Sequence, residues 1–207
     1  MLKHTMPLYE SGVVMIRHFY IRYEAKADIN YIYLLYLYSL AEYNTTKNLF
    51  DTVSYSSIRT LQKQIGDKFG KGSISPSTLS RLLNDERYGD YFKVDLKHKE
   101  IALKNATEGM PCFVMLTNRE VEFLLEQKDN LLIKYFLYIK HFCGLGAVGK
   151  QDFTAKQFLS FCGYSTKSNE YISKISSYNR LLVDNNFIRI EQYTDKQGHT
   201  RNNYYLL

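Results

Sequence analysis

The chain has no tryptophan, only three prolines and three cysteines, and no long apolar run. Cys112, Cys143 and Cys162 are an odd number without close pairs, so neither a disulfide framework nor a zinc ribbon is expected, and we expect core thiols. The longest apolar candidate, Ile29–Ala41, falls short of the roughly 18 uncharged apolar residues of a membrane-spanning helix. The first residues lack the apolar run of a signal peptide. These absences predict a cytoplasmic protein with no membrane partner.

Tyrosine, in contrast, is abundant, with 19 residues among 207. A coding genome rich in A and T would favour Tyr together with Lys, Asn and Ile, and stacking on bases is the alternative reason. The hydrophobic share of 45% predicts a globular chain. The Tyr-rich segments Ile29–Tyr43 and Leu131–Phe142 predict core helices, whose surplus aromatics are also available for a contact between domains or between chains.

The most informative feature that is present is an internal repeat. Three segments recur in the same order about 100 residues later, and such collinear matches indicate a duplicated unit. The matched pairs are Val13–Ile16 with Phe113–Leu116, Tyr36–Tyr38 with Phe136–Tyr138, and Ser80–Asp85 with Asn179–Asp184. Because about 100 residues is a common domain size, the repeat predicts two domains, residues 1–108 and residues 109–207.

The positive charge divides evenly between the two halves. The chain carries a net charge of +6, and its pI is about 9.0. Residues 1–108 carry 15 Lys and Arg against 12 Asp and Glu, and residues 109–207 carry 12 against 9. This balance permits binding to a polyanion without requiring it, since steering depends on where the charges cluster.

Periodicity predicts the same plan of elements in both halves. In each, an alternating apolar run predicts a strand, a 3.6-residue period predicts a helix, and Gly, Pro and capping residues mark the ends. For the first half the expected elements are a strand in Val13–Tyr23, a helix from Asp28 to about Tyr43, a short strand Phe50–Ser54, a helix Ser56–Ile65 stopped by Gly66, a helix capped by Ser75 with Pro76 at its first position, and a hairpin of Phe92–Leu96 with Ile101–Leu103.

The second half repeats this plan with one additional helix. Thr117 and Glu120 have the spacing of a capping box and predict a helix from Thr117 to about Gln127. The other expected elements are a long helix Leu131–Cys143 with Gly144 as its C-cap, a helix from Thr154 to Cys162 with Gly163 matching Gly66, a helix that begins at Ser168 or Asn169, and a hairpin of Phe187–Ile190 with Thr200–Leu206.

Three helices followed by a β-hairpin, with a short connection between the last two helices, resemble the winged-helix fold. The strings that carry the resemblance are Ser56–Gly66, Ser75–Asp85 and Phe92–Leu103 in one half, and Thr154–Gly163, Ser168–Asp184 and Phe187–Leu206 in the other. The expected fold class is therefore mainly α with small β-hairpins (α+β), with two winged-helix (helix-turn-helix) domains in pseudo-repeat.

In such a fold the third helix of each unit is the candidate recognition helix, because an α-helix fits the major groove. Its outer side in the first half is a small polar stripe of Ser77, Ser80, Arg81 and Asn84. Its outer side in the second half is longer and more basic, with Lys167 and Asn169 at the start, followed by Ser173, Lys174, Ser177 and Arg180. Arg and Asn pair with base edges, while Ser and Lys more often hold phosphates, so Arg180 is the preferred reader. A solvated helix face is the alternative reading of both stripes.

The hairpin tips supply a second set of candidate DNA contacts. Lys97, His98 and Lys99 in the first half, and Lys196, His199 and Arg201 in the second, would reach the sugar-phosphate backbone or the minor groove. A charged hairpin tip is also what any protein presents to water.

Three sequence patterns resemble nucleotide or metal sites, but none has the spacing or the neighbouring elements that such a site requires. Gly144–Gly149 matches G-x-G-x-x-G, but a helix precedes it where a nucleotide fingerprint needs a strand. Gly66–Gly72 is one residue short of a phosphate-binding loop, and Gly stands where Ser or Thr should bind magnesium. His141, Cys143 and Cys162 have no zinc spacing. We therefore expect a protein with no enzyme activity, cofactor, metal or small-molecule substrate.

Two winged-helix units in pseudo-repeat are similar to the initiator proteins of iteron-bearing plasmids. That resemblance implies one unit for dimerisation, which leaves a homodimer open, and one unit that grips the origin, here the second. Phage replisome organisers and transcription repressors use the same unit and remain open. The expected function is double-stranded-DNA binding without catalysis, in replication initiation or transcriptional control of a mobile element; the alternative is a winged-helix protein-protein interaction module, because the fold alone does not imply DNA.

Overall fold

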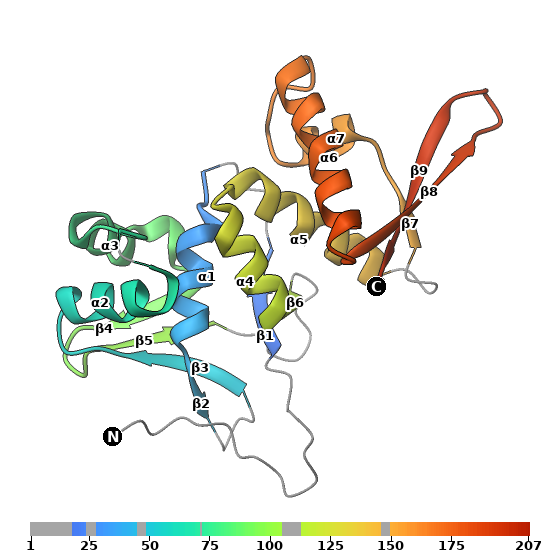
Figure 1. Ribbon diagram of the computed structural model, residues 1–207. Helices are drawn as coiled ribbons and strands as arrows, with labels where there is room; N and C mark the ends of the chain where they lie inside the picture. Colours follow the sequence, from blue (N-terminus) through green and yellow to red (C-terminus); the bar gives the residue numbers. More distant parts are fainter. Residues whose placement is uncertain (1–17, 24–27, 45–48, 71, 105–112, 146–149) are drawn as a thin grey trace, which may run out of the picture. The chain divides into compact units, whose positions relative to one another are not determined.

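The computed structural model describes residues 18–23, 28–44, 49–70, 72–104, 113–145 and 150–207. These residues form a mixed α+β structure of helices and small antiparallel sheets, which confirms the expected general class (Figure 1). They fall into two compact units. Unit 1 takes the described residues of Met1–Arg22, Ile32–Met110 and Met115–Lys128, and unit 2 takes those of Tyr23–Tyr31, Pro111–Val114 and Asp129–Leu207.

This partition differs in two segments from the division expected between residues 108 and 109. Helix α4 (Asn118–Gln127) groups with unit 1, and Tyr23–Tyr31 groups with unit 2. The second assignment has a visible cause within unit 2. The side chain of Asn130 accepts the Tyr31 N–H at 2.7 Å and donates to the Ile29 carbonyl at 3.1 Å, so it holds this segment against unit 2.

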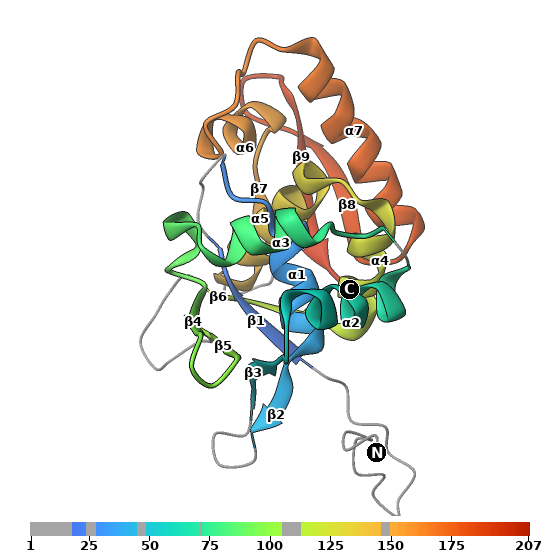
Figure 2. The ribbon, with the colours of Figure 1, turned by 90° about the vertical axis from the view of Figure 1, so that its left-hand side faces the viewer.

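Unit 1 consists of a four-stranded sheet and the helices that precede, interrupt and follow its strands in the chain. Its elements are α1 (Tyr31–Leu40, all but its first residue), β2 (Glu42–Asn44), β3 (Leu49–Ser54), α2 (Ile58–Phe69), α3 (Pro76–Leu83), a 3-10 turn (Glu86–Tyr88), β4 (Phe92–Asp95), β5 (Glu100–Leu103) and α4. The antiparallel sheet has the order β2-β3-β5-β4, and Figure 2 shows the turn that joins β4 to β5. Strands β1 (His18–Arg22) and β6 (Phe113–Thr117) pair in a separate sheet.

The predicted ends of two helices in this unit were wrong. The helix α1 stops at Leu40 rather than near Tyr43, because Glu42–Asn44 satisfies its backbone groups by pairing with β3 as strand β2. Gly66 does not stop α2. Its carbonyl accepts the N–H of Gly70 at 2.9 Å, and the positive φ of 94° that ends the helix occurs at Gly70.

The core of unit 1 lies where the apolar sides of its helices meet the sheet. Leu61 and Ile65 of α2 and Leu79 of α3 are fully buried, as the 3.6-residue period predicts. Tyr38 from α1 is also buried, and its hydroxyl donates to the Lys104 carbonyl at 2.8 Å. This bond connects the central helix to the end of the last strand.

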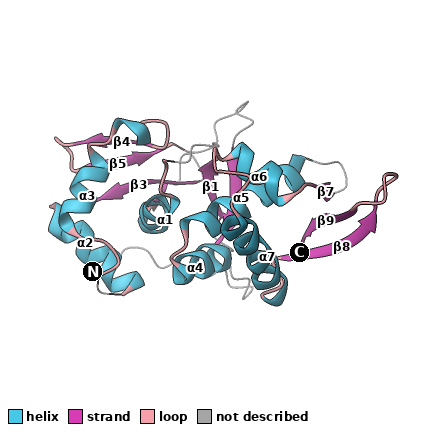
Figure 3. Cartoon of the chain, turned by 90° about the horizontal axis from the view of Figure 1, so that it is seen from above, coloured by secondary structure: helices cyan, strands magenta, loops and turns pink. Residues whose placement is uncertain are grey.

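Unit 2 has a similar order of elements, without counterparts of β2, the 3-10 turn and α4 among its described residues, and its third helix is longer. Its elements are α5 (Asn130–Leu145), β7 (Lys150–Asp152), α6 (Ala155–Phe161), α7 (Asn169–Asp184), β8 (Ile188–Thr194) and β9 (Thr200–Leu206), with the strand order β7-β9-β8. Figures 1 and 3 show β8 and β9 running out beyond the helices of this unit. Strand β7 was not anticipated, and Gly144 lies inside α5 rather than capping it.

Apart from β2, the 3-10 turn and α4, which occur only in unit 1, the two described units share one order of elements: helix, strand, helix, helix, then two strands, with the last strand between the other two. In unit 1 this is α1, β3, α2, α3, β4 and β5, and in unit 2 it is α5, β7, α6, α7, β8 and β9. Two of the matched strings fall on equivalent elements, Tyr36–Tyr38 with Phe136–Tyr138 in the first helix and Ser80–Asp85 with Asn179–Asp184 at the end of the third. Val13–Ile16 lies outside the described residues.

Tyrosine hydroxyls supply the polar centre of unit 2. Tyr135 donates to Asn179 Oδ1 at 2.6 Å, and the Nδ2 of Asn179 donates to the hydroxyl of Tyr204 at 3.2 Å. Phe153 stacks on the Tyr204 ring with centroids 4.2 Å apart and an interplanar angle of 5°. Since buried polar atoms are costly without partners, this network fixes α5, α7 and β9 to one another. Structural packing therefore accounts for these tyrosines.

The orientation of α7 predicts opposite effects for two neighbouring apolar residues. Leu182 is fully buried and Val183 is 38% exposed. We expect Leu182→Ala in the full chain to lower the free energy of unfolding by about 2–5 kcal/mol, because it leaves a cavity. Val183→Ala is the matched control and should change it by less than about 0.5 kcal/mol. Urea unfolding followed by circular dichroism measures both, and equal losses would contradict the orientation of the helix.

Candidate nucleic-acid interface

Local capping sets the start of both helices in the α6–α7 pair. Thr154 and Gln157 form a reciprocal capping box at α6, with Thr154 N–H donating to Gln157 Oε1 at 2.7 Å. Gly163, with φ of 72°, turns the chain after α6. The hydroxyl of Ser168 then accepts the Tyr171 N–H at 3.4 Å and opens α7, in agreement with the sequence prediction.

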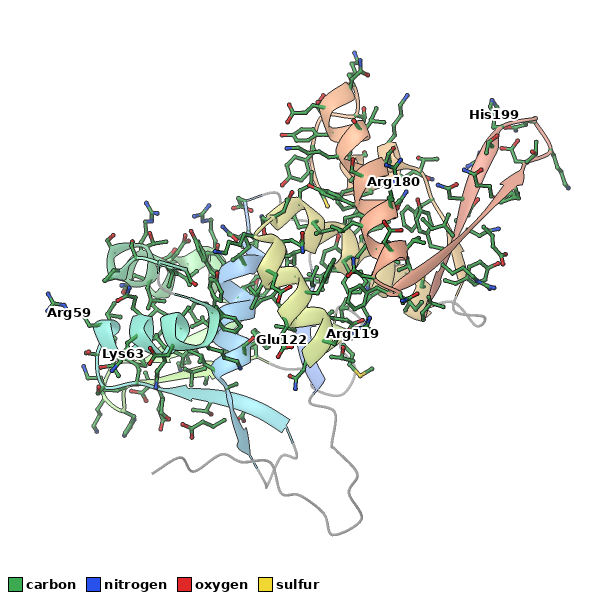
Figure 4. All side chains as sticks on the ribbon, in the orientation of Figure 1. Arg59, Lys63, Arg119, Glu122, Arg180 and His199 are labelled. Atoms are coloured by element: carbon green, nitrogen blue, oxygen red, sulfur yellow. The ribbon has the colours of Figure 1, made fainter. Side chains whose placement is uncertain are left out.

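The helix α7 separates a buried apolar side from an exposed polar side. Ile175, Tyr178 and Leu182 are buried, and Tyr178 also donates to Asp129 Oδ2 at 2.6 Å. The predicted outer residues all lie exposed, namely Lys167, Asn169, Ser173, Lys174, Ser177 and Arg180. The structure thus brings the second polar stripe together on one helix and the turn before it, and Figure 4 labels Arg180 on this helix.

The exposed side of α7 carries less net positive charge than the sequence pattern suggested. Lys174 pairs with Glu170 at 3.1 Å, and this carboxylate raises the pKa of the Lys174 ammonium. Asp184 is exposed on the last turn. Arg180 makes no ion pair with any residue that the structure describes. It is therefore the cation on α7 whose guanidinium is available to a ligand.

The stripe on α3 is shorter and partly tied to its own backbone. Ser75 caps the helix, accepting the Thr78 N–H at 3.1 Å, and Ser77 lies 3.0 Å from the Ser75 hydroxyl. Arg81 is exposed, Ser80 is half-buried, and the exposed Asn84 donates from Nδ2 to the Ser80 carbonyl at 2.8 Å. Asn84 is the C-cap of this helix, so one side of its amide already has a partner.

Both hairpin turns are built on an aspartate, a feature that the sequence reasoning missed. In the β4–β5 turn, Asp95 Oδ1 accepts the N–H groups of Lys97 and His98 at 2.9 and 3.0 Å. In the β8–β9 turn, Asp195 Oδ1 accepts the N–H groups of Gln197 and His199, both at 2.9 Å. The spacing of 100 residues between the two aspartates was the available signal. It adds a further match to the repeat.

The cations at the two tips differ in their availability. Lys97, Lys99 and Lys196 are exposed and form no ion pair among the residues described. His98 Nδ1 lies 2.7 Å from Asp95 Oδ2, and this carboxylate raises the pKa of the imidazole. Arg201, in contrast, is only 34% exposed and donates from Nε to an oxygen of Asp195 at 2.6 Å. Arg201 thus braces the turn rather than standing free beside it.

Two further cations of unit 1 were not selected from the sequence. Arg59 and Lys63 are exposed one turn apart on α2, and Figure 4 shows Arg59 directed away from the ribbon of this unit. Their i, i+4 spacing opposite the buried Leu61 and Ile65 was the available signal. They add two exposed cations to those that unit 1 carries on α3 and on its hairpin.

The glycine-rich string near α2 does not form a phosphate site. A hollow of about 320 Å³ is lined by residues of α2 and the following turn, among them Lys63, Gly66 and Gly72. The string enters this hollow as the last turn of a helix rather than as a loop before one. The carbonyl end of a helix carries partial negative charge, which disfavours phosphate.

The part of the chain that the structure describes has no group of three or more His, Cys, Asp or Glu side chains placed to hold a metal ion. Cys143 and Cys162 are buried free thiols, as expected, and Cys112 lies outside the described residues. None of the helices described is long and apolar enough to cross a bilayer.

Comparison with protein-family models, with curated proteins and with solved structures finds no match to this chain.

The Asp195 carboxylate gives the second hairpin a defined response to pH. The Arg201 guanidinium and then the backbone N–H of His199 lower the pKa of Asp195 to about 2. Because the folded pKa lies below the unfolded value of about 3.9, the stabilisation is present above that value and is lost as pH falls through 2. We expect the amide resonances of Gln197 and His199 to titrate with a midpoint of about 2 in NMR spectra. Asp195→Asn should abolish this transition, and a midpoint near 4 would contradict the ion pair.

Proposed function

We propose that this chain is a double-stranded-DNA-binding protein made of two winged-helix units without catalytic activity, acting in replication initiation or transcriptional control of a plasmid, phage or other mobile element. The observation that carries the proposal is the repeated topology of the two units, helix-strand-helix-helix-strand-strand with the last strand central. A third helix with one free face, followed by a projecting hairpin, is the arrangement by which a helix-turn-helix module enters a groove.

The dimensions of α7 suit the role of recognition helix in unit 2. Its 16 residues span about 24 Å. Between the exposed acids Glu170 and Asp184 near its two ends, its exposed polar residues are three serines and the cations Lys174 and Arg180. Short side chains permit close approach of the helix to the floor of the major groove, which is about 12 Å wide. Arg180, which has no ion pair with any described residue, would pair with a guanine edge, and Lys174 would exchange Glu170 for a phosphate.

Unit 1 would make contacts of the same kind, but more of its exposed cations lie on the hairpin than on the third helix. Its third helix offers Arg81 and Ser77, and its hairpin offers Lys97 and Lys99, which the Asp95 turn holds at the end of the sheet. Lysines on a hairpin would hold the phosphate backbone and fix orientation rather than read bases. Two such units on one chain would recognise a longer site than either alone, with avidity set by their linkage.

One observation favours the alternative, a winged-helix module that binds a protein. The exposed charges of α7 are balanced, since Glu170 and Asp184 oppose Lys174 and Arg180. A DNA-binding face is usually strongly positive, and a mixed face beside the 38% exposed Val183 suits a protein partner as well. The two functions predict different dependence on salt, which separates them in one experiment.

The decisive test is selection of a motif from random duplex DNA by the full chain at several salt concentrations. We expect one enriched motif and affinity that falls as salt rises, because lysines and arginines displace counterions from phosphates. Arg180→Ala should weaken binding to this motif about 5- to 150-fold and relax specificity at one base pair. Lys174→Ala should instead reduce the slope of log affinity against log salt by about 1.

Arg189→Ala is the matched control for charge. Arg189 lies on β8, pairs with Glu191 at 3.3 Å and stacks over the Tyr205 ring at 4.5 Å, at the end of the hairpin opposite its turn. Its removal should change DNA affinity less than about threefold, although it removes the same charge. Absence of enrichment and of retention at low salt would reject DNA binding and favour the protein partner. Equal losses in Arg180→Ala and Arg189→Ala would mean that α7 reads no base.

A further inference from the structure

The tip of the first hairpin exposes an apolar side chain in an otherwise charged turn. Leu96 follows β4 directly and is 68% exposed, whereas the neighbouring strand residues Phe92 and Ile101 are buried. Among the described residues, only the terminal Leu207 is a comparably exposed leucine. An isolated apolar residue on a surface needs no explanation by itself. The geometry around Leu96 is what sets it apart.

The turn holds Leu96 outward on a stiff support. Asp95 on one side of it accepts the N–H groups of Lys97 and His98 at 2.9 and 3.0 Å, which closes the turn immediately beyond the leucine. Lys99 has a left-handed φ of 57°, which returns the chain into β5. Strand β5 in turn lies between β3 and β4 in the sheet. The leucine is therefore presented by a braced hairpin and not by a loose loop.

The charge around Leu96 identifies the chemistry of its partner. Lys97 and Lys99 are exposed and have no ion pair among the residues described, and Asp95 raises the pKa of His98 next to them. Leu96 is followed by Lys97, His98 and Lys99, which lie between Asp95 and the exposed Glu100. A leucine beside free lysines matches a surface that is anionic outside and apolar inside. The narrow groove of a duplex, with phosphates at its rim and stacked bases within, is such a surface.

The second hairpin lacks this combination. Its tip runs Asp195-Lys196-Gln197-Gly198-His199 and contains no apolar side chain, and Arg201 is bound to Asp195. In both turns the aspartate accepts two backbone N–H groups, the second of them three residues after Asp95 and four residues after Asp195, but only the first turn has the leucine. The difference assigns the property to unit 1 alone, so the second hairpin is an internal reference.

We propose that Leu96 is a wedge that enters the minor groove of bound DNA, partly unstacks one base step and bends the duplex. This inference rests on the proposed function, because it requires that the chain binds duplex DNA. Lys97 and Lys99 hold the phosphates on either side of the groove while the leucine contacts the bases. Apolar side chains inserted between base steps kink DNA by about 20–90°. A kink of this kind favours flexible pyrimidine-purine steps.

The test measures binding and bending separately on one duplex. A 30-base-pair duplex carrying the motif enriched by the full chain is labelled with a fluorophore at each end, and affinity and energy transfer are recorded together. We expect the unaltered chain to shorten the distance between the ends. Leu96→Ala should abolish most of this change while weakening affinity less than about tenfold. Leu207→Ala, which removes an equally exposed leucine, should alter neither.

Charge removal distinguishes the wedge from its anchors. Lys97→Ala combined with Lys99→Ala should lower the slope of log affinity against log salt by about 2, since two phosphate contacts disappear. Leu96→Ala should leave this slope unchanged. Because all three side chains are exposed, each variant should keep the circular dichroism spectrum and thermal midpoint of the unaltered chain.

The outcomes separate failure of the wedge from failure of DNA binding. Salt-dependent binding with an undiminished bend in Leu96→Ala would overturn the wedge and leave the proposed function intact. No binding of the unaltered chain to any duplex would overturn both. Binding to vesicles of phosphatidylcholine with one third phosphatidylserine, lost in Leu96→Ala while DNA bending persists, would also overturn the wedge and assign the leucine to a lipid surface.

Discussion

Burial of one side of the third helix is the constraint on which each unit depends. Leu79 and Leu82 on α3, and Ile175, Tyr178 and Leu182 on α7, are buried in the core of their own unit. When one side of a helix is buried, the helical period fixes which residues face solvent. The same contacts that stabilise the unit therefore select its polar stripe and hold that stripe rigidly enough to serve as a binding face.

The two hairpins share an aspartate that closes the turn, but the other side chains at their tips differ. Asp95 and Asp195 each close their turn by accepting two backbone N–H groups, those of the second and third residues after Asp95 and of the second and fourth residues after Asp195. The residues beside the two aspartates differ. The first turn exposes Leu96, and in the second turn the other carboxylate oxygen of Asp195 accepts a hydrogen bond from Arg201. A conserved support with altered tips lets two copies of one scaffold make different contacts. Under the proposed function, unit 1 deforms the duplex and unit 2 reads it.

The availability of each cation matters more than the net charge of +6. Lys174 and Arg201 are paired within their own unit, whereas Arg180, Lys97 and Lys99 carry no such partner among the described residues. An exposed ion pair costs little to open, so Lys174 can still exchange its partner for a phosphate. Arg201 is less exposed and holds a turn together, and releasing it would sacrifice the geometry that presents the hairpin.

Most of the helices, the two hairpins and most of the polar faces could be predicted from the sequence, because periodicity, caps such as Ser75 and Ser168, and the repeat are local signals. The short strands β2 and β7 could not. The sequence prediction misplaced the ends at Gly66 and Tyr43, where pairing with distant strands or continued helix bonding overrides the local signal. Tertiary contacts establish which cations have an ion-pair partner, that the half-buried Asn179 joins Tyr135 to Tyr204, and that Leu96 is exposed. These properties depend on residues that meet across the fold, and no periodicity along the chain records such meetings.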